Sequence, residues 1–181
     1  MKQFNLTIIA VLFALTSFGQ QAATKEKELS QADQFSAQAG TLMEKQFLDI
    51  GTVKGIAVKV LKIKDLTSGT TKSALRLEYE YKSSYTNDTK VASLDADEID
   101  GLIKSIKNLQ TNVFTSTRDT YTEVTFRSRT GFEAGAYYST DKAKWVAYTQ
   151  LEKYDSKSFV SLNIEDFGTL LTLVEQAKTK M

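Results

Sequence analysis

The chain has 181 residues, of which 41% are hydrophobic and 25% charged, and its formal net charge is +1 at pH 7. It contains no Pro, no Cys and no His. Without His and Cys, the chain has no Ser-His or Cys-His catalytic pair, no disulfide, no cysteine for lipid attachment and no His- or Cys-ligated metal. The composition therefore excludes most familiar enzyme chemistries, and we expect a non-enzymatic protein without a cofactor.

The N-terminus has the features of a secretory signal peptide, which we place at residues 1–19. A positive charge at Lys2 precedes an apolar core at residues 6–15, and small residues stand at −3 and −1 before Gln20. The alternative is an uncleaved anchor, but the apolar run is shorter than the about 20 residues that a membrane helix needs. We therefore expect cleavage between Gly19 and Gln20, and a mature chain without a transmembrane segment.

Cleavage would leave a formally neutral chain. Lys2 is the one charged residue of the signal, so 23 basic residues become 22, against 22 acidic ones. Neutrality argues against binding to nucleic acid or to anionic membranes, which requires an excess of positive charge. About 160 residues suit one domain. Export without Cys favours a periplasmic or extracellular location. There, the partner would be an unknown ligand or an envelope protein. Self-association is also compatible with the sequence.

The first half of the chain predicts a leader followed by strands and a helix. Residues 20–40 are polar with some apolar residues at helical spacing, and we interpret them as a leader or short helix that ends near Gly40. Residues 41–50 fit either a strand or a continuation of that helix. After a turn bracketed by Gly51 and Gly55, period-two patterns predict strands and an apolar stripe predicts a helix. The predicted elements are strands at 56–64, 74–82 and 89–94 and a helix at 95–109.

The second half repeats this order after a polar connection at residues 111–120. The predicted elements are strands at 121–130, 132–139, 144–153 and 159–162 and a helix at 163–178. A shift of 68 positions places Leu94 on Leu162 and Asp95 on Asn163, and the apolar positions of the two helices also coincide. We therefore predict duplicated halves at about residues 41–110 and 120–179.

With residues 41–50 counted as a strand, each half consists of four strands and a helix. One helix covers only one face of a four-stranded sheet. We therefore predict an α+β fold of two ββββα-like repeats, in which curved antiparallel sheets carry helices on one face, within a single domain at residues 41–181.

This order of elements resembles that of the PUR-repeat and Whirly families, in which two such units pack as a pair. The resemblance covers roughly residues 41–179 and implies nucleic acid as the ligand. The segment Ser17 to Gln20 (SFGQ) is also similar to the cleavage site of small exported bacterial proteins. That second likeness implies no activity.

An acidic segment around Asp95 has two interpretations. An EF-hand loop that starts there needs an acid at position 5, Gly at 6 and Glu at 12. These positions hold Ile99, Asp100 and Ile106. We therefore favour a helix start, with Asp95 as the N-cap and Glu98 closing a capping box, over a calcium site.

Aromatic residues concentrate in the second half, where alternation divides them between two faces. The set expected in the core is Phe132, Ala134, Ala136 and Tyr138. Aromatic side chains on an open sheet face can stack on sugars or bases. We expect Tyr137 and Tyr148 to be the more exposed members.

Charged residues alternate along the same strands. Arg127 and Arg129 share a predicted strand face with Glu123, which is either a binding surface for an anionic ligand or a solvated face with cross-strand ion pairs. We assign no residue to catalysis or to metal binding. The candidate ligand-binding residues are Tyr137, Tyr148, Trp145, Arg127 and Arg129.

Three hypotheses about function follow. The first is an exported, non-enzymatic module that binds a ligand or protein partner through a sheet face. The second is an exported hydrolase that uses two Asp/Glu carboxylates facing each other about 5–10 Å apart. The third is a nucleic-acid binder of PUR or Whirly type, which requires a positive stripe beside exposed aromatic rings.

Overall fold

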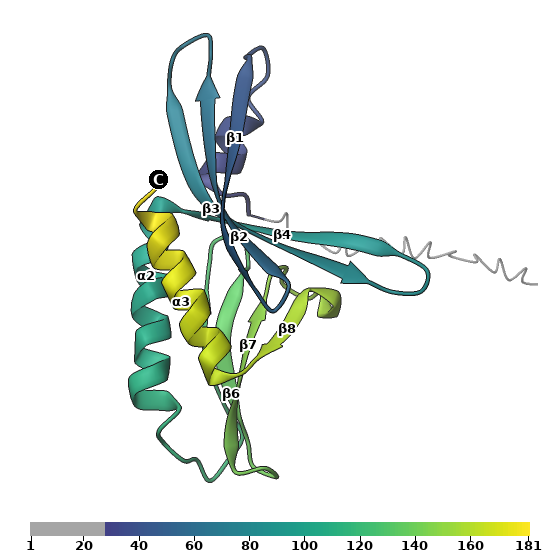
Figure 1. Ribbon diagram of the computed structural model, residues 1–181, viewed down its shortest axis with the longest axis vertical. Coiled ribbons are helices and arrows are strands. Elements are labelled where there is room, and N and C mark those ends of the chain that lie inside the picture. Colours follow the sequence, from purple (N-terminus) through teal and green to yellow (C-terminus); the bar gives the residue numbers. More distant parts are fainter. Residues whose placement is uncertain (1–27) are drawn as a thin grey trace, which may run out of the picture.

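A computed structural model of the chain describes residues 28–181, which form two four-stranded antiparallel sheets and three α-helices (Figure 1). The α+β class predicted from the sequence is confirmed. The predicted signal peptide, and the part of the predicted leader before residue 28, lie outside the described residues.

The first sheet has the strand order β1-β2-β3-β4. Residues 41–50, for which the sequence allowed strand or helix, belong mainly to β1. The period-two pattern of β3 is confirmed, because Leu75 and Leu77 are buried while Arg76 and Glu78 lie on the opposite face. The strands are β1 (Met43–Val53), β2 (Ile56–Asp65), β3 (Thr71–Lys82) and β4 (Asn87–Asp95).

The second sheet has the order β5-β6-β7-β8. Two of its strands are shorter than predicted. The backbone N–H of Ser128 donates to Phe132 and closes a turn directly after β5, and the chain turns again after β7, where Tyr154 has a φ of 65°. The strands are β5 (Thr122–Arg127), β6 (Glu133–Ser139), β7 (Lys144–Gln150) and β8 (Phe159–Leu162).

Both long helices begin at the N-cap residues predicted from the sequence, Asp95 and Asn163. In α3 (Ile164–Lys178), Asn163 accepts from the N–H of Asp166, and Asp166 accepts in return from the N–H of Asn163. In α2 (Ala96–Asn108), Glu98 accepts from the N–H of Asp95 at 3.0 Å. The chain continues from α2 into a π-helical turn, η1 (Leu109–Val113), where the sequence predicted the start of a polar connection.

The long helix of each half contacts the sheet of the other half. α3, from the second half, packs on β1, β2 and β3 of the first sheet, while α2 contacts β3 and β4 and also β5 and β6. The two helices lie side by side in Figure 1. Gly51 of β1 allows the close approach of α3, because a Cβ there would lie 2.6 Å from a methyl group of Leu173. One hydrophobic core therefore contains residues of both sheets and both helices.

A short helix, α1 (Gln31–Ser36), covers part of the other face of the first sheet. Its Ala32 and Phe35 pack with Leu61, Ile63 and Ala74 in a second, small cluster. The prediction that helices cover one face is therefore wrong for the first sheet: α2 and α3 cover one face, and α1 covers part of the opposite one. A separate 3-10 turn, η2 (Ser156–Ser158), precedes β8.

Candidate functional site

The outer face of the second sheet carries a line of four aromatic rings, which we call the aromatic row: Tyr121, Tyr137, Tyr148 and Phe159. The inner face of β6 and β7 is in the core, since Ala136 pairs with Ala147 and both are buried. Side chains alternate along a strand, so Tyr137, Tyr148 and Phe159 point to the opposite, outer face. The row crosses all four strands, because Tyr121 directly precedes β5.

Neighbouring rings in the row are in contact. The ring centroids are 6.1 Å apart for Tyr121 and Tyr137, 6.4 Å for Tyr137 and Tyr148, and 5.1 Å for Tyr148 and Phe159. Tyr148 and Phe159 are stacked, with 21° between their ring planes, whereas the other two pairs are tilted by 32° and 43°. The two end rings are the most accessible, with 60% of Tyr121 and 40% of Phe159 exposed.

Gly135 makes room for the centre of the row. It pairs with Thr125 on one side and with Tyr148 on the other. The hydroxyls of Tyr148 and Thr125 share a hydrogen bond of 2.9 Å, so the Tyr148 side chain spans the strand at Gly135. The expectation that Tyr148 is exposed is therefore wrong: only 7% of it is exposed. Tyr137, by contrast, is half-buried on the same face.

Two phenols of the row, those of Tyr121 and Tyr148, have a raised pKa. Tyr121 donates a short hydrogen bond to Glu123, which raises the pKa of Tyr121 to about 12. Burial raises the pKa of Tyr148 above its ordinary value of 10.0. Tyr121 and Tyr148 therefore contribute rings and neutral hydroxyl groups to this face.

Arg127 lies on the same outer face and shares it with Glu123, as the sequence predicted. Its Nε donates to Glu133 at 2.7 Å, and its terminal nitrogen lies 2.6 Å from the same oxygen. With Phe159 and Lys153 it lines a shallow, open depression of ≈ 580 Å³ at one end of the row. The charge of Arg127 is thus compensated within the face.

The structure does not bring Trp145 to this face. Trp145 pairs with Tyr138 and therefore points inward, where the two rings meet edge to face at 5.4 Å. Its indole N–H donates to the carbonyl of Ser116 at 2.8 Å, and Arg118 lies over its ring. Trp145 fixes the connection between the two halves and is separate from the aromatic row.

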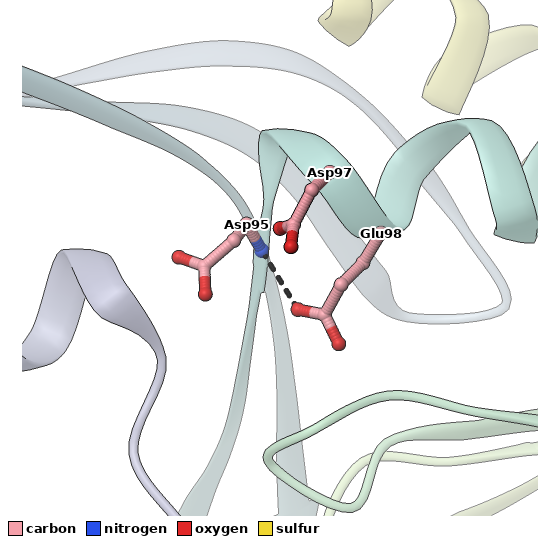
Figure 2. Close-up of side chains that lie close together, drawn as sticks. All are labelled: Asp95, Asp97 and Glu98. Carbon is pink, nitrogen blue, oxygen red and sulfur yellow. Dashed lines mark hydrogen bonds between the residues drawn. The ribbon is translucent and has the colours of Figure 1, made fainter.

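Arg129 also lies away from the aromatic row, because β5 ends at Arg127 and Arg129 belongs to the following turn. Its guanidinium lies 2.5 Å from Asp95 and 2.9 Å from Asp97, and its backbone N–H donates to Glu98 at 2.6 Å. Figure 2 shows these three carboxylates around the start of α2. We call these four residues the acidic junction.

The acidic junction connects three parts of the chain. The Asp95 carboxylate also accepts from the N–H groups of Gln31 and Ala32, at the start of α1. Oxygens of the three acids lie within 4.8 Å of one another, a spacing that could hold a metal ion. In this arrangement, however, the Arg129 guanidinium supplies the positive charge, which favours a structural role for the acids.

Comparisons with known proteins give no family for this chain: no protein-family model matches it, and no curated protein or solved structure is significantly similar to it. Within residues 28–181, no helix has the length and hydropathy needed to cross a membrane.

The sequence reasoning did not include Tyr121 and Phe159 in the site. Both are at the ends of the row, and their membership depends on the pairing register across four strands, which one sequence does not reveal. An alternation signal was present, since Phe159 and Ser161 alternate with the buried Val160 and Leu162.

Proposed function

We propose that the mature chain is an exported, non-enzymatic module that binds a protein partner through the outer face of the second sheet. The aromatic row carries this proposal, because it crosses a face on which none of the described helices packs. The proposed export depends on the signal-peptide pattern of residues 1–19. N-terminal sequencing of the exported protein should therefore begin at Gln20.

The geometry of the row favours a protein over a sugar or a nucleic acid. Sugars and bases stack on the accessible flat faces of rings, and here Tyr148, inside the row, is buried and stacked on Phe159. Tyrosine is enriched at protein interfaces because it offers a large, rigid surface with a polar group. The paired charges of Arg127 and Glu133 also give no positive stripe for a phosphate backbone.

The acidic residues support a structural rather than a catalytic role. Asp95, Asp97 and Glu98 form a close group of acids among the described residues, and Arg129 contacts all three. We therefore propose that these acids position α1, α2 and the β5–β6 turn.

We also propose that the two halves arose by duplication. Each half has four antiparallel strands followed by a helix. Asp95 and Asn163, which coincide under the 68-residue shift, are both helix N-caps with an acid at the third helical position. This arrangement supports a common origin that includes the cap as well as the apolar stripe.

The experiment is co-purification of the partner from the envelope fraction of the source cell, with tagged wild type and a Tyr121→Ser/Phe159→Ser variant. Both substitutions remove exposed end rings, so the fold should be kept. Tyr85→Ser is the matched control, because Tyr85 is 95% exposed in the β3–β4 turn of the other sheet.

We expect one protein to be retained by the wild type and by Tyr85→Ser, and to be reduced about tenfold or more with the double variant. Equal retention by all three proteins would show that the row is not the binding surface. Retention of polysaccharide or single-stranded DNA, lost in the double variant, would show that the proposed partner class is wrong.

A further inference from the structure

The first sheet presents a long edge strand to solvent. β1 has 11 residues and, among the described strands, pairs with β2 alone. Phe47 is 51% exposed, and the neighbouring Leu48 is also exposed on the other face of the strand. α1 packs mainly against β3 and β4, so it leaves this edge uncovered. An uncovered, partly apolar edge of this length is a template for pairing with another strand.

The free backbone groups of this edge can be assigned. The N–H of Leu66 donates to the carbonyl of Leu42 at 2.8 Å, so the backbone groups of Leu42 point toward β2. Pairing with β2 is regular from Met43 to Asp49, and the direction alternates along a strand. The backbone N–H and C=O of Lys45, Phe47 and Asp49 therefore point away from the sheet.

We propose that β1 pairs antiparallel with β1 of a second copy of this chain, with Phe47 opposite Phe47 of the partner subunit. In this register, Lys45 is opposite Asp49 of the partner subunit. By twofold symmetry, Asp49 is opposite Lys45 of the partner subunit. Lys45, Phe47 and Asp49 lie on one face of the strand, where their partners in β2 are Ile63, Leu61 and Lys59. The strand is thus complementary to itself, as a closed twofold interface requires.

Charge selects this register over its neighbours. Centring the pair on residue 45 would place Lys45 opposite Lys45, and centring it on residue 49 would place Asp49 opposite Asp49. Like charges directly opposite each other destabilise a strand pair, whereas opposite charges stabilise it. Centring the pair on residue 46 would place Phe47 opposite Lys45 and leave Asp49 without an opposite charge. Centring it on residue 48 would place Phe47 opposite Asp49 and leave Lys45 without an opposite charge. This self-complementarity favours a second copy over a foreign strand.

The first test is sedimentation equilibrium of the purified protein over a range of concentrations. We expect a dimer whose Kd rises about tenfold or more with Lys45→Glu, which places two acids opposite each other twice. Asp49→Lys should also weaken the dimer, and it additionally removes the 3.6 Å ion pair of Asp49 with Lys59 of the same chain. The charge-swapped Lys45→Asp/Asp49→Lys variant should restore the dimer to within about threefold of the wild type. All these side chains are exposed, so each variant should retain the wild-type circular dichroism.

The second test uses the absence of Cys from the chain. Directly opposed, hydrogen-bonded residues have Cα atoms about 5.5 Å apart, which is within the range of a disulfide. Phe47→Cys should therefore cross-link two subunits under mild oxidation. Lys45→Cys is the matched control, because the two copies of residue 45 would be about 14 Å apart in this register.

The outcomes separate clearly. A dimer that Lys45→Glu weakens, that the charge swap restores and that Phe47→Cys cross-links supports the proposal. A wild type that stays monomeric up to about 1 mM overturns it. So does a dimer that is insensitive to Lys45→Glu or not restored by the charge swap, or a cross-link that forms through Lys45→Cys in place of Phe47→Cys. None of these results depends on the aromatic row of the other sheet.

Discussion

At the residue scale, Gly135 determines whether the aromatic row can form. A Cβ at this position would lie 2.4 Å from the carbonyl oxygen of Val124 and 2.9 Å from the Thr125 hydroxyl. Neither backbone can move without disturbing the β5–β6 pairing. We expect Gly135→Ala to lower the free energy of unfolding by about 3 kcal/mol, measured by urea denaturation.

Gly101→Ala in α2 is the control variant, because the nearest atom to a Cβ at Gly101 is 3.4 Å away. This substitution should stabilise the protein by about 0.5–1 kcal/mol. Equal effects would contradict this account of Gly135.

Two arginines that looked alike in the sequence differ in the structure. Arg129 contacts Asp97, the buried Asp95 and the nearly buried Glu98, whereas Arg127 is more exposed and pairs with a single acid, the buried Glu133. Loss of Arg129 would leave acids of the acidic junction without their counter-charge. We expect Arg129→Met to lower the free energy of unfolding by about 2 kcal/mol, and Arg127→Met, which leaves one acid without its partner instead of several, by about 1 kcal/mol. Urea denaturation of the two variants measures the difference, and a larger loss for Arg127→Met would overturn this assignment.

At the element scale, β4 is joined to the β7–β8 connection by an ion pair. Lys90 of β4 lies 2.5 Å from Asp155, and its hydrogen bond lowers the pKa of that carboxyl below the ordinary value of 3.8. The stabilisation is present above the ordinary pKa and is lost as the pH falls through the lowered one. We therefore expect Asp155→Asn to be less stable than the wild type at pH 7, and the difference to shrink below about pH 3.8.

Denaturation midpoints of both proteins across this pH range provide the measurement. Asp141→Asn, in the exposed turn between β6 and β7, is the control for the loss of one surface carboxylate. A gap between wild type and Asp155→Asn that stays constant from neutral to acidic pH would mean that the pair does not contribute as described.

The elements themselves were accessible from sequence because their signals are local. Alternation gave β3, and the capping residues Asp95 and Asn163 marked the starts of α2 and α3. The site was accessible only in part. Tyr137 and Arg127 were placed on the outer face, but the burial of Tyr148 depends on a glycine in the neighbouring strand. The turn that removes Arg129 from β5 depends on hydrogen bonds between Ser128, Phe132 and Gly131.

At the scale of the whole molecule, the exchange of helix contacts joins the halves and leaves two surfaces on different sheets. α3 packs on the first sheet although it belongs to the second half, a contact between distant segments that no local pattern encodes. Figure 1 shows the end of the first sheet that carries the β2–β3 turn and the start of β1 extending away from the second sheet. The aromatic row and the edge of β1 can therefore act independently, and a dimer through β1 would present two aromatic rows.

The central claim is that the aromatic row binds a protein partner. The most direct measurement is the Kd of the co-purified partner for the wild type and for Tyr121→Ser/Phe159→Ser, by isothermal titration calorimetry. Truncation of two end rings, each contributing about 1 kcal/mol, should raise the Kd about 30-fold, while Tyr85→Ser leaves it unchanged. A Kd for the double variant within about twofold of the wild type would contradict the claim.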